Sequence, residues 1–165
     1  MPLFNVAELR AALPRGRRLI GLDPGAKLIG VALSDPLLML ASPYGTLKRG
    51  KLRDAAEAVG AIAAKEGAGG LVVGLPLSMD GSFGPAAQAA RDWAKALSEA
   101  AGLPAALWDE RLSSAAVNRM MIEADLSRAK RAAAVDRAAA AWMLRAALDA
   151  TRPPPAPFPD DPDPV

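Results

Sequence analysis

The sequence contains neither cysteine nor histidine, and each absence excludes a class of chemistry. Without cysteine there is no disulfide, no thiolate zinc site and no thiol nucleophile. Without histidine there is no Ser-His-Asp triad and no HExxH zinc site. Hydrolytic chemistry in this chain would therefore rest on carboxylates, lysine, hydroxyl groups or a bound metal ion.

Long apolar runs are also absent from the 165-residue chain. No stretch reaches the roughly 20 apolar residues that a membrane-spanning helix needs, and the N-terminal residues lack the apolar segment of a signal peptide. The sequence thus predicts a soluble, cytoplasmic protein without a membrane partner. The formal net charge is +2, and residues 152–165 contribute −2 of it, so the rest of the chain has a charge of +4. That excess gives modest support to a polyanionic partner.

Three regions follow from composition and periodicity. Residues 1–16 form a leader in which NVAELRAAL is a candidate short helix, docked or loose. Residues 17–151 have the mixed pattern of one folded domain. Residues 152–165, RPPPAPFPDDPDPV, are too rich in proline and acid to bury apolar surface, which predicts a disordered tail.

Within the domain, hydrophobic periodicity predicts a hairpin meander followed by alternating strands and helices. That order indicates a mixed sheet, antiparallel on one side and parallel on the other, covered by helices. Strands are expected over 18–22, 28–33, 38–47, 71–75 and 105–108, and helices over 51–65, 85–100, 111–124 and 128–150.

Asp23 ends the first strand of the stretch IGLDPGAKLIGVALSD, directly before a glycine turn. In open α/β sheets, ligands bind beyond the carboxyl ends of the strands, so this position is typical of a functional residue. An Asp-Pro-Gly turn explains the same residue without a function, because aspartate forms local hydrogen bonds there. Both interpretations stay open at this point.

Asp109 and Glu110 follow the strand that ends at Trp108 and precede a predicted helix. Acids in the first turn of a helix complement its macrodipole, and Asp109 could simply cap the helix. The pair also lies at the carboxyl end of a strand in the parallel half of the sheet, which again is a place for site residues.

Asp136 lies in the last predicted helix, on or beside its packing face. The apolar stripe of that face consists of Ala132, Val135, Ala139, Trp142, Met143 and Ala146. An unpaired carboxylate there has a large desolvation cost, which Arg137, Lys130 or a metal ion could offset. If the three acids converge, they repel one another and need a cation, and Mg²⁺ or Mn²⁺ suits oxygen ligands.

Four stretches, LDPGAKLIGVALSD, VVGLPLSMDGS, WDERLSS and AAVDRAAAAWML, resemble in order and spacing the motifs of the YqgF (RuvX) family. Members of that family are described as Holliday junction resolvases and as pre-16S rRNA nucleases. The resemblance spans about residues 17–150. The residues at positions 28 and 137, Leu28 and Arg137, differ from those of many relatives. They change the charge near the site but leave the acids in place.

The resemblance implies an α/β fold of the RNase H-like kind: a mixed five-stranded sheet of order 3-2-1-4-5, strand 2 antiparallel to the rest, flanked by helices. It implies catalytic, metal-binding acids at Asp23, Glu110 and Asp136, with Asp109 as a less favoured ligand, and Mg²⁺ or Mn²⁺ as cofactor. In this scheme one ion activates a water nucleophile and the other stabilises the leaving oxygen.

Basic residues near these acids are candidates for phosphate contacts, although each could also be an ordinary solvated charge. They are Lys27, Arg111 and the cluster of Arg128, Lys130 and Arg131. The loop Leu75–Gly81 is expected to border the substrate, with Asp80 as a turn residue.

The implied activity is hydrolysis of phosphodiester bonds by a metal-dependent nuclease that matures the 5′ end of pre-16S rRNA on the ribosome precursor. Alternatives are a Holliday junction resolvase for branched DNA, which would act as a homodimer rather than a monomer, and a non-catalytic RNA-binding assembly factor. Nucleotide binding of the actin-like kind is disfavoured because it needs two such domains, and this chain has room for one.

Overall fold

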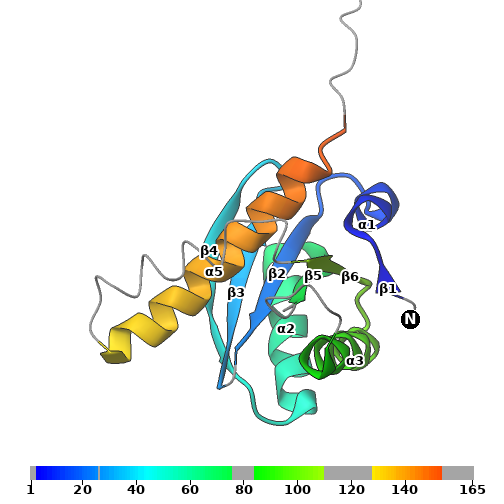
Figure 1. Ribbon diagram of the computed structural model, residues 1–165. Coiled ribbons are helices and arrows are strands. Elements are labelled where there is room, and N and C mark those ends of the chain that lie inside the picture. The colour runs from blue at the N-terminus through cyan, green and yellow to red at the C-terminus, as the bar shows by residue number, and fades with distance from the viewer. Residues whose placement is uncertain (1–2, 26, 76–83, 110–127, 154–165) are drawn as a thin grey trace, which may run out of the picture.

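The computed structural model describes residues 3–25, 27–75, 84–109 and 128–153, and for residues 128–137 it describes the backbone alone. These residues form a sheet with helices on both of its faces (Figure 1). The elements are β1 (Leu3–Phe4), α1 (Val6–Ala12), β2 (Arg18–Pro24), β3 (Leu28–Ser34), β4 (Ala41–Lys48), α2 (Leu52–Glu66), β5 (Ala68–Leu75), α3 (Pro85–Ala101), β6 (Ala105–Asp109) and α5 (Arg128–Ala150).

The strands form one sheet in the order β1-β6-β5-β2-β3-β4. β3 is antiparallel to both of its neighbours, β2 and β4, whereas β5 is parallel to β2 and to β6. The expected order 3-2-1-4-5 with an antiparallel second strand is therefore confirmed. The structure adds the two-residue strand β1, which pairs in parallel with β6 and is too short to leave a pattern in the sequence.

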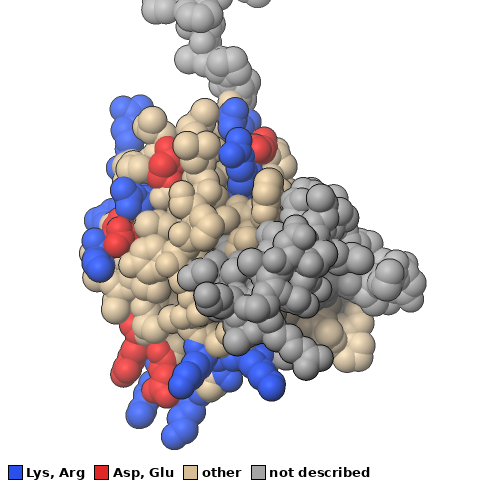
Figure 2. Space-filling view, turned by 90° about the vertical axis from the view of Figure 1, so that its left-hand side faces the viewer, with Lys and Arg blue, Asp and Glu red and all other residues tan. Residues whose placement is uncertain are grey.

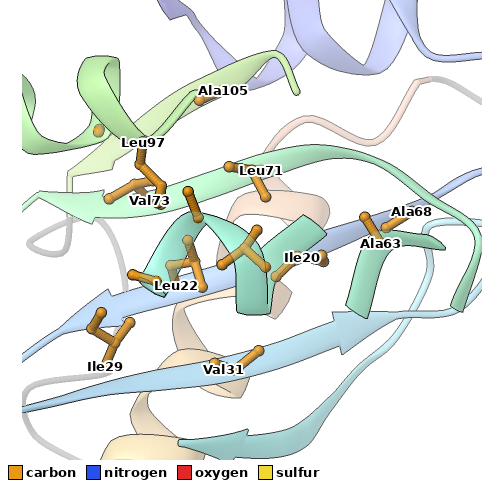
Figure 3. Packing of buried hydrophobic residues seen from close by; sticks show 14 residues of the cluster. Ile20, Leu22, Ile29, Val31, Ala63, Ala68, Leu71, Val73, Leu97 and Ala105 are labelled. Atoms are coloured by element: carbon orange, nitrogen blue, oxygen red, sulfur yellow. The ribbon is translucent and has the colours of Figure 1, made fainter. Parts of the chain in front are cut away.

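Side chains of the central strand β2 alternate between the two faces of the sheet, as the pleat requires. Ile20 and Leu22 pack on the face that α2 and α3 cover, beside Val73 and Leu97 (Figure 3). Leu19 belongs to the core on the opposite face, which α5 and α1 cover. Odd-numbered residues of β2 thus lie on the α5 face, and this parity decides where Asp23 lies.

Local sequence explains where the helices begin and end. α2 and α3 stop at Gly67 and Gly102, which adopt φ values of 71° and 70°, the left-handed conformation that glycine accepts without strain. Pro85 occupies the first turn of α3, where its missing N–H costs nothing. The side chain of Asn5 caps α1 by accepting from the Glu8 N–H at 2.8 Å.

The leader helix is docked rather than loose. Val6 and Leu9 of α1 are buried in the same core cluster as Met143 and Leu144 of α5. Arg10 donates from its guanidinium to the carbonyl oxygen of Leu148 at 2.8 Å, which satisfies one of the free carbonyls at the end of α5.

Two expectations need correction. Trp142 was placed on the packing face of the last helix, but 45% of it is exposed, because the buried positions of α5 are centred on Ala140, Leu144 and Leu148. The expected strand over 38–47 begins only at Ala41, because residues 35–40 form a turn.

Other expectations lie outside the described residues: the helix over 111–124, the loop over 76–81 and the tail from residue 154. Among the helices that the structure describes, none combines the length and the apolar character needed to cross a membrane.

Candidate active site

Asp23 is a buried carboxylate at the carboxyl end of β2. Only 5% of the residue is exposed, and it pairs across the hairpin with Gly30 of β3. The turn that follows is closed by the Gly25 N–H, which donates to the Leu28 carbonyl at 2.8 Å. By the alternation of β2, Asp23 lies on the α5 face of the sheet. Burying an acid at the end of a central strand costs free energy, which is a reason to look for a function there.

The carboxyl ends of the three parallel strands meet at this edge. Leu22, Val73 and Leu107 share one row across β2, β5 and β6, and each strand continues by one residue, to Asp23, Gly74 and Trp108, of which Gly74 and Trp108 are paired. Gly74 has no side chain between the other two. Trp108 is 9% exposed and belongs to the core on the α5 face, and its indole N–H has no hydrogen-bond acceptor among the described residues.

Asp109 lies one position further along β6, in register with Leu75. Because Trp108 faces α5, the alternation of the strand places Asp109 on the other face, where Leu75 packs against α3. Asp23 and Asp109 therefore share an edge of the sheet but not a face. Of the DER motif, the structure describes only this residue, since Glu110 and Arg111 lie outside the described ranges.

α5 lies across β2 and β3 and approaches β2 very closely at Gly21, where a Cβ would lie 2.9 Å from the Cβ of Leu144. Leu148, near the end of α5, lies in one cluster with Leu19, at the start of β2, and accepts a hydrogen bond from Arg10 of α1. The helix therefore runs antiparallel to β2. Moving one turn from Ala140 towards the start of α5 covers about 6 Å, and moving from Gly21 to Asp23 covers about 7 Å. The backbone of Asp136 is thus carried to the end of the sheet where Asp23 lies.

The candidate phosphate contacts are described unevenly. Lys27 is exposed in the turn after Asp23, and Lys130 and Arg131 lie in the first turn of α5, where the structure gives the backbone alone. The predicted set of site residues stays a prediction, because the side chains of Glu110 and Asp136 are outside what the structure describes.

Arg49, which no sequence pattern singled out, contacts the β2–β3 turn and α3 at this edge. Its guanidinium donates to the Gly25 carbonyl at 2.8 Å, and its backbone N–H donates to the Lys27 carbonyl at 2.9 Å. The guanidinium also lies 5.8 Å from the centroid of the Trp93 ring on α3, a cation–π distance. The run of cations KRGKLR between a strand and a helix was the available sequence signal.

The donor set at this edge fits a hard cation and no softer one. Carboxylate oxygens are the ligands that Mg²⁺ and Mn²⁺ prefer, and the chain offers neither thiolate nor imidazole. Among the described residues no three acids lie together as a metal cluster. Of the three predicted ligands, Asp23 is the one whose side chain the structure describes, and Glu110 and Asp136 would have to complete the site.

The strand order, the antiparallel second strand and the acid at the end of the central strand define a domain of the RNase H-like class. A solved structure agrees: "T. thermophilus RuvC in complex with Holliday junction substrate" matches with a TM-score of 0.51 and 18% identity, over 81% of this chain and 94% of that one. At this identity the likeness concerns the fold alone.

The particular family is shown by sequence. The chain belongs to the RuvX family, whose model, described as "Holliday junction resolvase", matches residues 17–150. A protein of Gluconacetobacter diazotrophicus is 67% identical over 92% of this chain and 99% of its own length, and one of Acidiphilium cryptum is 65% identical over 90% and 94%. Both are named "Putative pre-16S rRNA nuclease". The resemblance found in the four motifs is confirmed.

Proposed function

We propose that the protein is a metal-dependent nuclease that hydrolyses phosphodiester bonds and trims precursor 16S rRNA. The single observation behind the proposal is the buried carboxylate of Asp23 at the carboxyl end of the central strand. The names of the two relatives supply the substrate. If precursor 16S rRNA is the substrate, the protein acts in the cytoplasm and its partner is the ribosome precursor.

In this proposal Asp23, Glu110 and Asp136 would hold Mg²⁺ or Mn²⁺, and the bound ions would supply an activated water and neutralise charge on the leaving oxygen. Asp109 has the weaker claim of the two acids in the DER motif, because the alternation of β6 puts it on the face opposite Asp23. The protein would hold the carboxylate oxygens of these acids at the rigid edge of the sheet and bind the phosphate backbone of the substrate beside them.

The test compares wild type with Asp23→Asn on a precursor 16S rRNA fragment, with Mg²⁺, with Mn²⁺ and with a chelator. Asparagine keeps the shape of the side chain and removes its charge. We expect metal-dependent cleavage by the wild type and a loss of at least about a hundredfold in the variant, with RNA binding retained. Equal cleavage by both would contradict the proposal, and binding without any cleavage would indicate a non-catalytic assembly factor.

A second candidate is resolution of four-way DNA junctions, which the description of the matching family favours. The same assay with a junction of equal nucleotide length, at identical metal and salt, separates the two substrates. Symmetric nicking of the junction requires two active sites, so it should appear together with a dimer in solution. Trimming of rRNA has no such requirement.

A further inference from the structure

A group of cations surrounds the turn that follows Asp23. Lys48, Arg49, Lys51 and Arg53 lie within six consecutive residues, from the last residue of β4 to the first turn of α2, and Lys27 lies on the neighbouring β2–β3 turn. All five residues are exposed, and we call them the basic rim. Figure 2 shows several Lys and Arg side chains at the lower edge of the molecule, with Asp and Glu beside them, and in Figure 1 β4 passes into α2 at this edge.

The basic rim is attached directly to the candidate active site. Lys48 pairs with Leu28 at the end of the β3–β4 ladder. Arg49 then bonds to the carbonyls of Gly25 and Lys27, in the turn that begins two residues after Asp23. The backbone of Lys48 and of Arg49 therefore has a fixed position relative to Asp23.

Strand geometry gives the distance. Asp23 pairs with Gly30 and Gly30 pairs with Thr46, so Thr46 lies two strand spacings, or about 10 Å, from Asp23. Lys48 lies two residues, or about 7 Å, further along β4. The Cα atoms of Lys48 and Asp23 are thus about 12 Å apart, which a few nucleotides of a bound strand would span.

Arg49 has a structural role through its contacts with Gly25 and Trp93, but no ion pair among the described residues accounts for the charges of the basic rim. Among the described residues, ion pairs hold Arg18, Arg145 and Arg152, but no member of the basic rim is in one. Lys51 occupies the N-cap of α2 without a side-chain cap bond, and Arg53 lies in the first turn. Cations at a helix N-terminus oppose the macrodipole, so both positions cost free energy in the isolated protein.

We propose that the basic rim binds the phosphodiester backbone of the substrate a few nucleotides from the bond that is cut. Exposed cations that form no ion pair with other described residues, placed beside an acidic cleavage site, would hold the polyanion that the acids alone would repel. The contacts are to the backbone, so they add affinity without reading base sequence. The proposal rests on the proposed nuclease function, but it is tested by binding and not by cleavage.

The experiment uses the full chain with Asp23→Asn, so that substrate is bound and not cut. In this background, Lys48→Glu with Lys51→Glu is compared with a control, Arg15→Glu with Arg17→Glu. The control makes the same change in net charge at exposed residues before β2, at the opposite end of the strand from Asp23. Affinity is measured by fluorescence anisotropy over a series of salt concentrations, with a precursor rRNA fragment and with a four-way DNA junction.

We expect the rim variant to weaken binding at least about tenfold at low salt and to lower the slope of log K against log salt by about 1.4 to 1.8, the value for two lost phosphate contacts. The affinity of the control variant should stay within about threefold of the parent's affinity, since a change in net charge acts weakly on the site from the far end of β2. The probe that loses more affinity shows which backbone the rim fits.

An unchanged slope in the rim variant, an equal loss in the control, or no binding of either probe by the parent would overturn the proposal. Circular dichroism and melting temperature check folding, and the exposure of all four substituted side chains predicts little change. Failure of cleavage in the chain that retains Asp23 would instead count against the proposed nuclease, whatever the binding result.

Discussion

At the scale of single residues, Gly21 determines how closely α5 approaches the sheet. A Cβ there would lie 2.9 Å from the Cβ of Leu144 and 3.4 Å from the carbonyl oxygen of Ala140. Ala140 and Leu144 are fully buried in α5, so neither the Leu144 Cβ nor the Ala140 carbonyl has room to move aside. Because Asp136 lies one turn before Ala140, this contact also sets the height of Asp136 above the sheet.

Gly21→Ala is therefore expected to lower the free energy of unfolding by about 1–3 kcal/mol, the cost of overpacking a core. It should also lower the cleavage rate, since α5 is displaced from the edge that holds Asp23. Gly45→Ala is the matched control, because a Cβ at this other strand glycine meets nothing within 4 Å. Urea unfolding of both variants checks the prediction, and equal stabilities would contradict it.

At the scale of elements, the β3–β4 connection depends on one carboxylate. Asp35 accepts from the backbone N–H groups of Met39 at 2.7 Å, Leu40 at 2.8 Å and Leu37 at 3.3 Å. These bonds fix a turn in which Leu38 takes a φ of 57°. Burial raises the pKa of Asp35, but the backbone N–H donors of Leu40, Met39, Leu37 and Asp35 itself outweigh burial and hold this pKa below its ordinary value.

A lowered folded-state pKa means that the ionised form of Asp35 stabilises the fold above the ordinary aspartate pKa of about 4, and that this contribution is lost as pH falls through the lower value. Because solvent screens this partly exposed carboxylate, loss of its hydrogen bonds in Asp35→Ala should cost only about 1 kcal/mol at pH 7, and the difference in stability from wild type should shrink below about pH 4. Denaturant unfolding at several pH values measures both. Asp92→Ala, at an exposed position of α3, is the control, and a difference that does not depend on pH would refute the assignment.

The elements themselves were largely predictable, because most of them are long and periodic. α2 and α3 were expected over 51–65 and 85–100 and are observed at Leu52–Glu66 and Pro85–Ala101. The error at Trp142 has a physical cause: α5 is so rich in alanine that its periodicity does not define one face. The contact at Gly21, a tertiary feature, selects Leu144 instead.

At the scale of the whole molecule, sequence reasoning placed Asp23 at the edge of the sheet but could not show how distant segments connect there. The carboxyl end of a strand is a local feature, so Asp23 and Asp109 were found from patterns alone. The role of Arg49 depends on the β3–β4 pairing, which brings it beside Gly25, and on α3, which brings Trp93 to it. Such contacts exist only after the sheet has formed.

The same scale settles whether the N-terminal segment is an appendage or a part of the core. Leu9 of α1 is fully buried, in one cluster with residues of β2, β5, β6 and α5. Removing most of its side chain leaves a cavity between α1 and the sheet that the rigid strands cannot close. The segment therefore contributes to the stability of the entire fold, although it lies outside the region that the family model matches.

Leu9→Ala is expected to lower the free energy of unfolding by about 2–5 kcal/mol, in a single cooperative transition that includes α5. Leu37→Ala makes the same chemical change at a leucine that is 78% exposed and should change stability by less than about 0.5 kcal/mol. Thermal and denaturant unfolding, followed by circular dichroism, compare the two. If Leu9→Ala were as stable as Leu37→Ala, α1 would be docked without contributing to the fold, and the burial of Leu9 would have no energetic consequence.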